Sequence, residues 1–157
     1  MPGLHYDLLK TIAQLSNSTL SLQVKLDRML QTTSKAFQSV QCLILKPEEI
    51  GENGFLSRVA LQKKPHWVEE GSSLQQEHLL PAEKELLCPA FVCIPLYHED
   101  SFRGIFYIGF SNHREFSSLE KDLLLLVGEA ITGAIQQDHP RAVCEFICGL
   151  PRRTGGI

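Results

Sequence analysis

Two dense apolar runs near the middle of the chain, residues 91–97 and 105–110, give the clearest strand pattern in the sequence. Both are rich in Phe, Ile, Val and Tyr, which suit a pleated, half-buried surface. The polar segment between them has the length of a hairpin connection. The pattern therefore predicts two neighbouring antiparallel strands, residues 91–97 and 103–110, at the centre of a sheet.

Three other segments repeat apolar residues at helical spacing. They are residues 4–15, 21–38 and 117–137. Ser21 can cap the second helix, while Ser117 and Glu120 form an S-x-x-E capping box at the start of the third. We expect the third helix to end before Pro140, because proline cannot donate the backbone hydrogen bond that continues a helix.

The remaining apolar segments are short. They read as strands at residues 40–45, 55–61 and 66–68 and as a helix at residues 82–87. Strands joined by hairpins, with helices at both ends of the chain, indicate an α+β fold built on an antiparallel sheet. Residues 139–157 have little amphipathic order, so we expect a partly disordered tail after a single domain formed by residues 1–138.

The composition is that of a folded protein without a membrane span. The chain has 157 residues, of which 43% are hydrophobic and 21% charged, and its formal net charge is -3. These values exclude a disordered chain and a globally basic nucleic-acid-binding protein. No apolar run approaches the ~20 residues of a transmembrane helix, and the N-terminus shows no secretion signal. An odd count of five cysteines suits reduced thiols, so we expect a cytoplasmic protein.

Several motifs in the second half of the chain match one known family. They are Cys93-Ile94-Pro95-Leu96, then Arg103-Gly104-Ile105-Phe106-Tyr107-Ile108, then Phe116-Ser117 before a Leu-rich last helix. In combination they resemble the C-terminal half of a GAF domain. The helix at residues 20–37 and the strand at residues 40–45 are similar to the N-terminal half, so the resemblance covers about residues 4–137.

The resemblance implies a GAF/PAS-like fold with a central antiparallel five-stranded sheet in the order 2-1-5-4-3. The N- and C-terminal helices would lie on one face, and a short irregular insert, residues 71–88, would cover a ligand pocket on the other. It also implies a regulatory or ligand-sensing role in signal transduction. From apolar density, we expect residues 40–46 to lie inside the sheet, since they are more apolar than residues 55–62.

Five residues near the insert are candidates for the lining of a ligand pocket. They are His66, Trp67, His78, Cys88 and Tyr107. Pockets combine aromatic walls with a few polar groups, which these residue types supply. The alternative is that Trp67 fills the edge of the core and both histidines are solvated.

No cofactor or metal is predicted. The Asn-Lys…Phe…Asp-Glu pattern of cyclic-nucleotide-binding GAF domains is missing, and no cysteine is followed by the histidine common at bilin attachment sites. His66 and His78 are too few for an iron site. Cys144 and Cys148 have helical spacing, but with His139 they give three ligands at best, and a zinc site needs about four.

An enzymatic alternative within the same fold is a free methionine sulfoxide reductase, which uses cysteines around the Pro-Leu strand. Cys88 lies near that place, and Cys42 could resolve a disulfide. However, apolar residues follow Cys88, with no acid to bind the ammonium group of a free amino acid, and apolar burial raises a thiol pKa. We therefore expect no enzyme, interpret Cys88 and Cys93 as core thiols, and expect no disulfide among the three cysteines.

The last helix has more apolar positions than one packing partner can cover. Leu124 and Leu125, together with Leu9 of the first helix, would form a surface patch of the kind that marks an association site. We therefore expect a homodimer through the terminal helices. A small-molecule ligand or a signalling partner protein is a further candidate as a binding partner. We expect neither nucleic acid nor a membrane as partner. Two roles remain open, a ligand-sensing module and a ligand-free dimerisation scaffold; a pocket filled by its own side chains would favour the scaffold.

Overall fold

The computed structural model describes residues 2–70 and 79–148, with side chains for residues 6–70 and 79–137. The elements in chain order are α1 (Pro2–Ser16), α2 (Leu22–Phe37), β1 (Gln41–Leu45), the 3-10 helix η1 (Pro47–Glu49), α3 (Phe55–Gln62), β2 (His66–Val68), α4 (Pro81–Leu86), β3 (Ala90–His98), β4 (Ser101–Phe110) and α5 (Ser118–Cys148).

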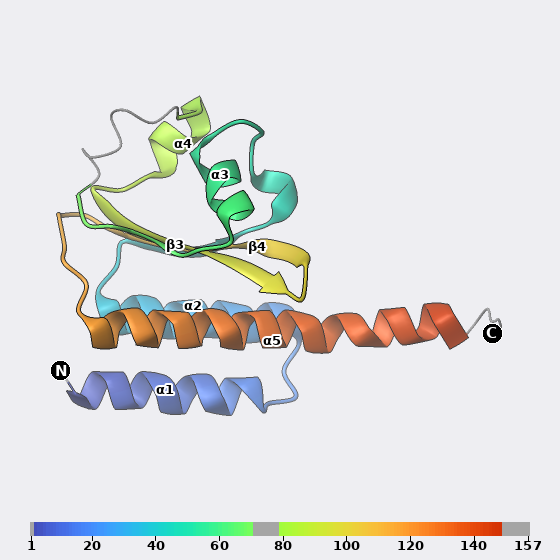
Figure 1. The fold of residues 1–157 in the computed structure, drawn as a ribbon. Coiled ribbons are helices and arrows are strands. Elements are labelled where there is room, and N and C mark those ends of the chain that lie inside the picture. Colours follow the sequence, from blue (N-terminus) through green and yellow to red (C-terminus); the bar gives the residue numbers. More distant parts are fainter. Residues whose placement is uncertain (1, 71–78, 149–157) are drawn as a thin grey trace.

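A sheet lies between two layers of helices (Figure 1). Its strands run in the order β1-β4-β3-β2, and all neighbouring strands are antiparallel. The helices α2 and α5 cover one face, which we call the helix side, and α1 packs beneath them. The short helices η1, α3 and α4 lie over the other face, which we call the roof side. The arrangement confirms the predicted α+β class.

The hairpin of β3 and β4 forms the centre of the sheet, as predicted. The two strands pair from Ala90 opposite Phe110 to the connecting turn, and each has a further strand on its outer side. Gly104 of β4 has a φ angle of 134°, which only glycine adopts readily. A Cβ atom there would lie 2.5 Å from the carbonyl oxygen of Leu45, so glycine also permits the close approach of β1.

The segment predicted as a strand at residues 55–61 is instead the helix α3. Phe55, Leu56 and Val59 are buried, and their i, i+1, i+4 spacing places them on one face of a helix. Leu61, which an alternating strand would bury on the same side as Val59, is 80% exposed. The described sheet therefore has four strands and not the five that the resemblance implied.

The loss of that strand moves β1 to the edge of the sheet. The prediction that residues 40–46 lie inside the sheet is wrong, because the segment expected beside them forms α3. All of β1 is half-buried, whereas β4 is fully buried from residue 104 to residue 110. The edge position of β1 leaves one side of its backbone without a neighbouring strand in the described sheet.

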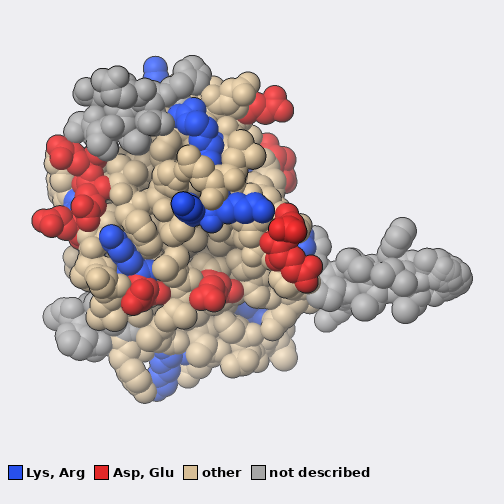
Figure 2. Space-filling view, in the orientation of Figure 1, with Lys and Arg blue, Asp and Glu red and all other residues tan. Residues whose placement is uncertain are grey.

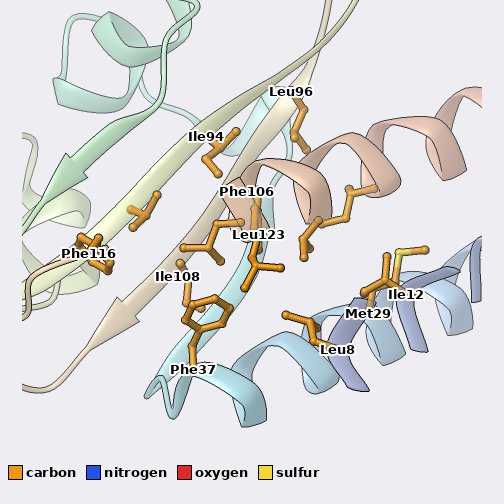
Figure 3. Packing of buried hydrophobic residues seen from close by; sticks show 14 of the residues in the cluster. Leu8, Ile12, Met29, Phe37, Ile94, Leu96, Phe106, Ile108, Phe116 and Leu123 are labelled. Atoms are coloured by element: carbon orange, nitrogen blue, oxygen red, sulfur yellow. The ribbon is translucent and has the colours of Figure 1, made fainter. Parts of the chain in front are cut away.

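The helix-side core is formed by the apolar stripes of three helices against the sheet (Figure 3). Ile94, Leu96, Phe106 and Ile108 of the sheet share one cluster with Met29 and Phe37 of α2 and with Leu123, Leu124, Val127 and Ile131 of α5. Leu8 and Ile12 of α1 belong to the same cluster, and α1 packs against α2 and α5. Gly128 of α5 lies against β3, since a Cβ atom there would make an ordinary contact with the side chain of Ile94 at 3.4 Å. The apolar periodicity of the three long helices thus predicted their buried faces.

The helix α5 begins as predicted but ends later. Its capping box is present, with the Ser117 hydroxyl accepting from the Glu120 N–H at 3.1 Å and the Glu120 carboxylate accepting from the Ser117 N–H at 3.0 Å. The helix does not end before Pro140 but continues to Cys148. Proline removes one hydrogen bond and costs about 3 kcal/mol inside a helix, yet the residues on both sides keep helical geometry. Residues 149–157 of the expected tail lie outside the described residues.

The surface shows charges of both signs. On the face drawn in Figure 2, Lys and Arg side chains are interspersed with Asp and Glu side chains. This face offers no extended basic area of the kind that binds phosphate backbones. Within residues 2–70 and 79–148, none of the helices combines the length and the apolar character of a membrane-spanning segment.

Candidate functional site

An apolar cluster lies between the sheet and the roof-side helices. Its buried members are Phe55, Leu56, Val59, Val68, Phe91, Cys93, Ile105 and Tyr107. The ring of Phe91 contacts two others, with centroid distances of 5.9 Å to Phe55 and 5.6 Å to Tyr107. These side chains occupy the face on which the resemblance places a ligand pocket.

One buried carboxylate ties α3 to α4. Glu83 is 4% exposed, and its Oε1 accepts hydrogen bonds from the N–H of Phe55 at 3.0 Å and of Leu80 at 2.9 Å. Its Oε2 accepts from the N–H of Leu56 at 2.8 Å. The first N–H groups of a helix have no partner within the helix, and the helix dipole favours a negative charge there. A single side chain therefore caps both α3 and α4.

The hydroxyl group of Tyr107 forms hydrogen bonds with backbone groups at Cys88 and Leu86. The Cys88 N–H donates to the Tyr107 hydroxyl at 3.0 Å, and this hydroxyl donates to the carbonyl of Leu86 at 3.1 Å. Burial and the hydrogen bond with Cys88 raise the pKa of Tyr107, which is neutral. A Cβ atom at Gly109 would lie 2.5 Å from the Cys88 sulfur, so this glycine makes room for the arrangement.

The predicted pocket residues His66 and Trp67 point to opposite faces of the sheet. The ring of His66 lies on the roof side, 5.8 Å from the ring of Phe55, whereas Trp67 packs into the helix-side core, 6.1 Å from the ring of Phe116. A pocket lined by both is therefore excluded, because successive residues of a strand alternate between faces. His78 lies outside the described residues.

Solved structures with the same architecture decide the fold. A GAF domain of a phosphoenolpyruvate-protein phosphotransferase from Acinetobacter has a TM-score of 0.72 at 21% sequence identity, over 89% of this chain and 97% of that chain. The GAF domain of such a phosphotransferase from Coxiella burnetii has a TM-score of 0.69 at 14% identity, over 88% of this chain and 98% of that chain. This is a GAF fold. No family model and no curated protein sequence matches the chain.

One of the similar GAF-fold structures is an enzyme, the free methionine-R-sulfoxide reductase of Neisseria meningitidis. It has a TM-score of 0.65 at 10% identity, over 85% of this chain and 89% of that chain. In the present chain, the two thiols suggested for this chemistry lie on opposite sides of the sheet. Cys42 packs against the helix-side core, whereas Cys88 packs against the roof-side cluster. A disulfide between them would have to pass through the sheet.

Burial raises the thiol pKa of Cys42 and Cys93, which makes these two cysteines poor nucleophiles. Cys42, Cys88 and Cys93 are all free. Burial raises the pKa of the Cys42 thiol to about 12. Burial raises the pKa of Cys93 as well, with a smaller contribution from the nearby Glu83 carboxylate. Because the thiolate is the reactive form, Cys42 and Cys93 are unreactive at neutral pH.

The three residues predicted for a dimer interface lie in different environments. Leu124 is fully buried in the helix-side core, so its prediction as a surface residue is wrong: α5 packs on both the sheet and α2, and its buried arc is wider than a single stripe. Leu125 is half-buried at the rim of that core, and Leu9 is 38% exposed. Leu119 and Leu126 of α5, which the prediction omitted, are 54% and 47% exposed.

No metal site is present among the described side chains, where no three His, Cys, Asp or Glu residues come together. The side chains of His139, Cys144 and Cys148 lie outside the described part of the molecule. The structure therefore does not test whether His139, Cys144 and Cys148 could bind a metal ion.

Arg114 is a structural residue that the sequence prediction missed. Its guanidinium group lies 4.6 Å from the ring centroid of Phe110 and 5.8 Å from those of Phe37 and Phe116, and it pairs with Glu120 at 2.6 Å. These contacts attach the link between β4 and α5 to the end of α2. Phe110, Phe116 and Glu120 lie within six residues of Arg114 in the sequence, whereas Phe37 is 77 residues away, and no local pattern indicates that contact.

Glu83 was also missed, although part of its role was detectable. Pro81 at the first position of α4 and Glu83 at the third are a helix-start signature, which predicts the bond to Leu80. The bonds to Phe55 and Leu56 span 28 and 27 residues, and no sequence pattern indicates them.

Proposed function

We propose that this GAF-fold protein is a non-enzymatic regulatory module that works as a dimerisation scaffold, without a small ligand on its roof side. The observation that carries the proposal is the burial of the roof-side cluster among the described residues. Phe91, Tyr107 and Ile105 are fully buried, and the Tyr107 hydroxyl has a donor and an acceptor within the chain. A ligand there would have to displace side chains whose burial stabilises the fold by about 1.5–3 kcal/mol each.

The proteins of similar structure support a regulatory role. They include the two phosphotransferase GAF domains and part of a methyl-accepting chemotaxis protein, which has a TM-score of 0.64 at 13% identity. The reductases of the same fold use thiol chemistry for which Cys42 and Cys88 are poorly placed. Regulation through protein contacts is therefore the better reading of this chain.

The surface that suits a second copy runs along α1 and α5. The two helices contact each other and run in the same direction (Figure 1). Tyr6 and Leu9 are exposed on α1, and Leu119 and Leu126 are exposed on α5. The first pair is three residues apart and the second pair seven, so each pair shares one face of its helix.

The side of α1 that carries Leu9 is turned away from α2. Thr11 and Gln14 line a surface hollow together with Arg28 and Gln31 of α2, so their side of α1 faces α2. At 3.6 residues per turn, Leu9 lies about 160° around the helix from Thr11. Leu9 therefore lies on the side of α1 nearer α5, and we expect the exposed apolar residues of the two helices to adjoin. We call Tyr6, Leu9, Leu119 and Leu126 the helix patch.

Charges of opposite sign border the helix patch. Lys10 is exposed on α1, while Asp122 and Glu129 are exposed on α5. A twofold axis parallel to the helices would place α1 of one copy against α5 of the other, with the basic rim facing the acidic rim. The patch is thus complementary to itself, which favours a second copy as its occupant.

Sedimentation velocity at several concentrations tests the scaffold. We expect a dimer at tens of micromolar, and we expect Leu126→Glu to convert it to a monomer, because a carboxylate cannot be buried unpaired in the interface. Leu61→Glu is the matched control, since Leu61 is exposed on α3, on the opposite side of the sheet. A wild-type protein that stays monomeric, or a dimer that survives Leu126→Glu, contradicts the proposed interface.

A further inference from the structure

The open edge of β1 has hydrogen-bonding groups without a strand to receive them. β1 pairs with β4 on one side only, and the described sheet has no strand beyond it. The Leu45 carbonyl oxygen points toward Gly104 of β4. Because the N–H and C=O groups of successive residues alternate in direction along an antiparallel strand, those of Cys42 and Ile44 point outward.

Natural proteins protect such edges with charged residues, prolines, bulges or very short strands. β2, at the other edge, has three residues and is flanked by Pro65 and Glu69. β1 has five residues, Gln-Cys-Leu-Ile-Leu, with no charge and no proline within the strand, although Lys46 and Pro47 follow it directly. Val40, directly before it, is 57% exposed. Protection by charge and proline is therefore confined to the C-terminal end of β1, and the five residues of the strand itself carry neither.

We propose that the open edge of β1 binds an extended segment of another protein, which adds to the sheet as its fifth strand. Such addition uses main-chain hydrogen bonds for affinity and side-chain contacts for selectivity. Here the outward groups of Cys42 and Ile44 supply the hydrogen bonds. The proposal does not depend on the dimer, because the helix patch lies on α1 and α5 and not on the sheet.

The size of the edge selects the kind of partner. Five residues at about 3.4 Å each give an edge of roughly 17 Å, which is the length of one extended segment of the same size. A stable complex of two folded domains buries about 1,200–2,000 Å² of surface, so it would need contacts outside this edge. A single extended segment can use the edge fully, whereas a second folded copy would need further contacts around it.

The side chains of β1 define the chemistry of the bound segment. Cys42 and Ile44 are half-buried at the rim of the helix-side core, and Leu43 and Leu45 are half-buried at the rim of the roof-side cluster. An added strand would extend both clusters, so apolar residues are required on both of its faces. The partner segment is therefore uncharged over its central residues and rich in Val and Ile.

Amide hydrogen exchange followed by NMR tests this edge directly. The probe is the peptide acetyl-Lys-Thr-Val-Ile-Val-Thr-Lys-amide, and the matched control carries N-methyl groups on its Val and Ile residues, which keep the side chains but block strand pairing. In the free protein, the amides of Cys42 and Ile44 exchange fast and those of Leu43 and Leu45 exchange slowly. The unmethylated peptide slows exchange at Cys42 and Ile44 by at least about tenfold, and the methylated peptide does not.

A variant pair adds a test on the protein side. Val40→Lys places a charge beside the edge and should weaken peptide binding several-fold, while Val24→Lys, at an exposed valine of α2, should leave it unchanged. The proposal is overturned by unchanged exchange at Cys42 and Ile44, by an equal effect of the methylated peptide, or by slow exchange of these amides in the free monomer. Protection that rises with protein concentration alone would assign the edge to a second copy and overturn the choice of partner.

Discussion

The carboxylate of Glu83 accepts a hydrogen bond from the backbone N–H of Leu56 at 2.8 Å, although 27 residues separate the two in sequence. This bond fixes the start of α3, the helix that takes the place of an expected strand. The same carboxylate caps α4, so α3 and α4 cover the apolar cluster as a unit. Loss of the carboxylate should loosen the cover of that cluster.

We expect Glu83→Gln to lower the free energy of unfolding by about 1–3 kcal/mol. The amide keeps one acceptor oxygen but sets an NH₂ donor against a backbone N–H in a buried site. Glu85→Gln, at an exposed position of the same helix, is the control and should change the stability by less than about 0.5 kcal/mol. Urea denaturation measures both. Equal stability of the two variants would show that Glu83 does not hold the helices.

The raised pKa of Cys42 should make the stability fall at alkaline pH. The unfolded thiol ionises near 9.0 and the folded thiol near about 12. Between these values the unfolded state binds fewer protons than the folded state, so the free energy of unfolding decreases as the pH rises. A single thiol contributes at most about 1.4 kcal/mol per pH unit.

Chemical denaturation of wild type and Cys42→Ala from about pH 8 to about pH 11 isolates this contribution. The variant should show a shallower decrease of the unfolding free energy above about pH 9, since other titrating groups are common to both proteins. Parallel curves would mean that Cys42 is not buried in the folded protein.

We expect no thiol-dependent reduction of free methionine sulfoxide. Cys42 and Cys88 lie on opposite sides of the sheet, and apolar residues follow Cys88 in the chain. Consumption of methionine sulfoxide in the presence of dithiothreitol should match that of a protein-free blank. A rate above the blank that disappears in Cys88→Ala would contradict the non-enzymatic assignment.

Local patterns predicted the elements that depend on local interactions. The hairpin of β3 and β4 follows from two apolar runs and a short polar connection, and α5 follows from its stripe and its Ser117–Glu120 capping box. The strand expected at residues 55–61 fails on the same criterion, because the i, i+1, i+4 spacing of Phe55, Leu56 and Val59 is helical. This wrong assignment also affected the predicted strand order. A strand at residues 55–61 would have paired with β1, so β1 was expected inside the sheet, whereas it lies at the edge.

The candidate site was predicted less well because its contacts are long-range. The opposite directions of His66 and Trp67 follow from the strand that the sequence predicted there, so that error was avoidable. The bonds from Glu83 to α3 and the contact of Arg114 with Phe37 join distant segments. The burial of Leu124 depends on α5 packing against two neighbours at once, which the stripe of one helix does not reveal.

Native mass spectrometry of the protein purified from cells, without added ligand, tests the central claim most directly. The claim predicts a species of twice the chain mass, with no additional mass that is released on denaturation. Bound mass of a few hundred daltons that disappears on denaturation would contradict the ligand-free scaffold and restore a ligand-sensing role. A spectrum that shows only monomers at the concentrations where we expect a dimer in sedimentation would contradict the proposed dimerisation scaffold.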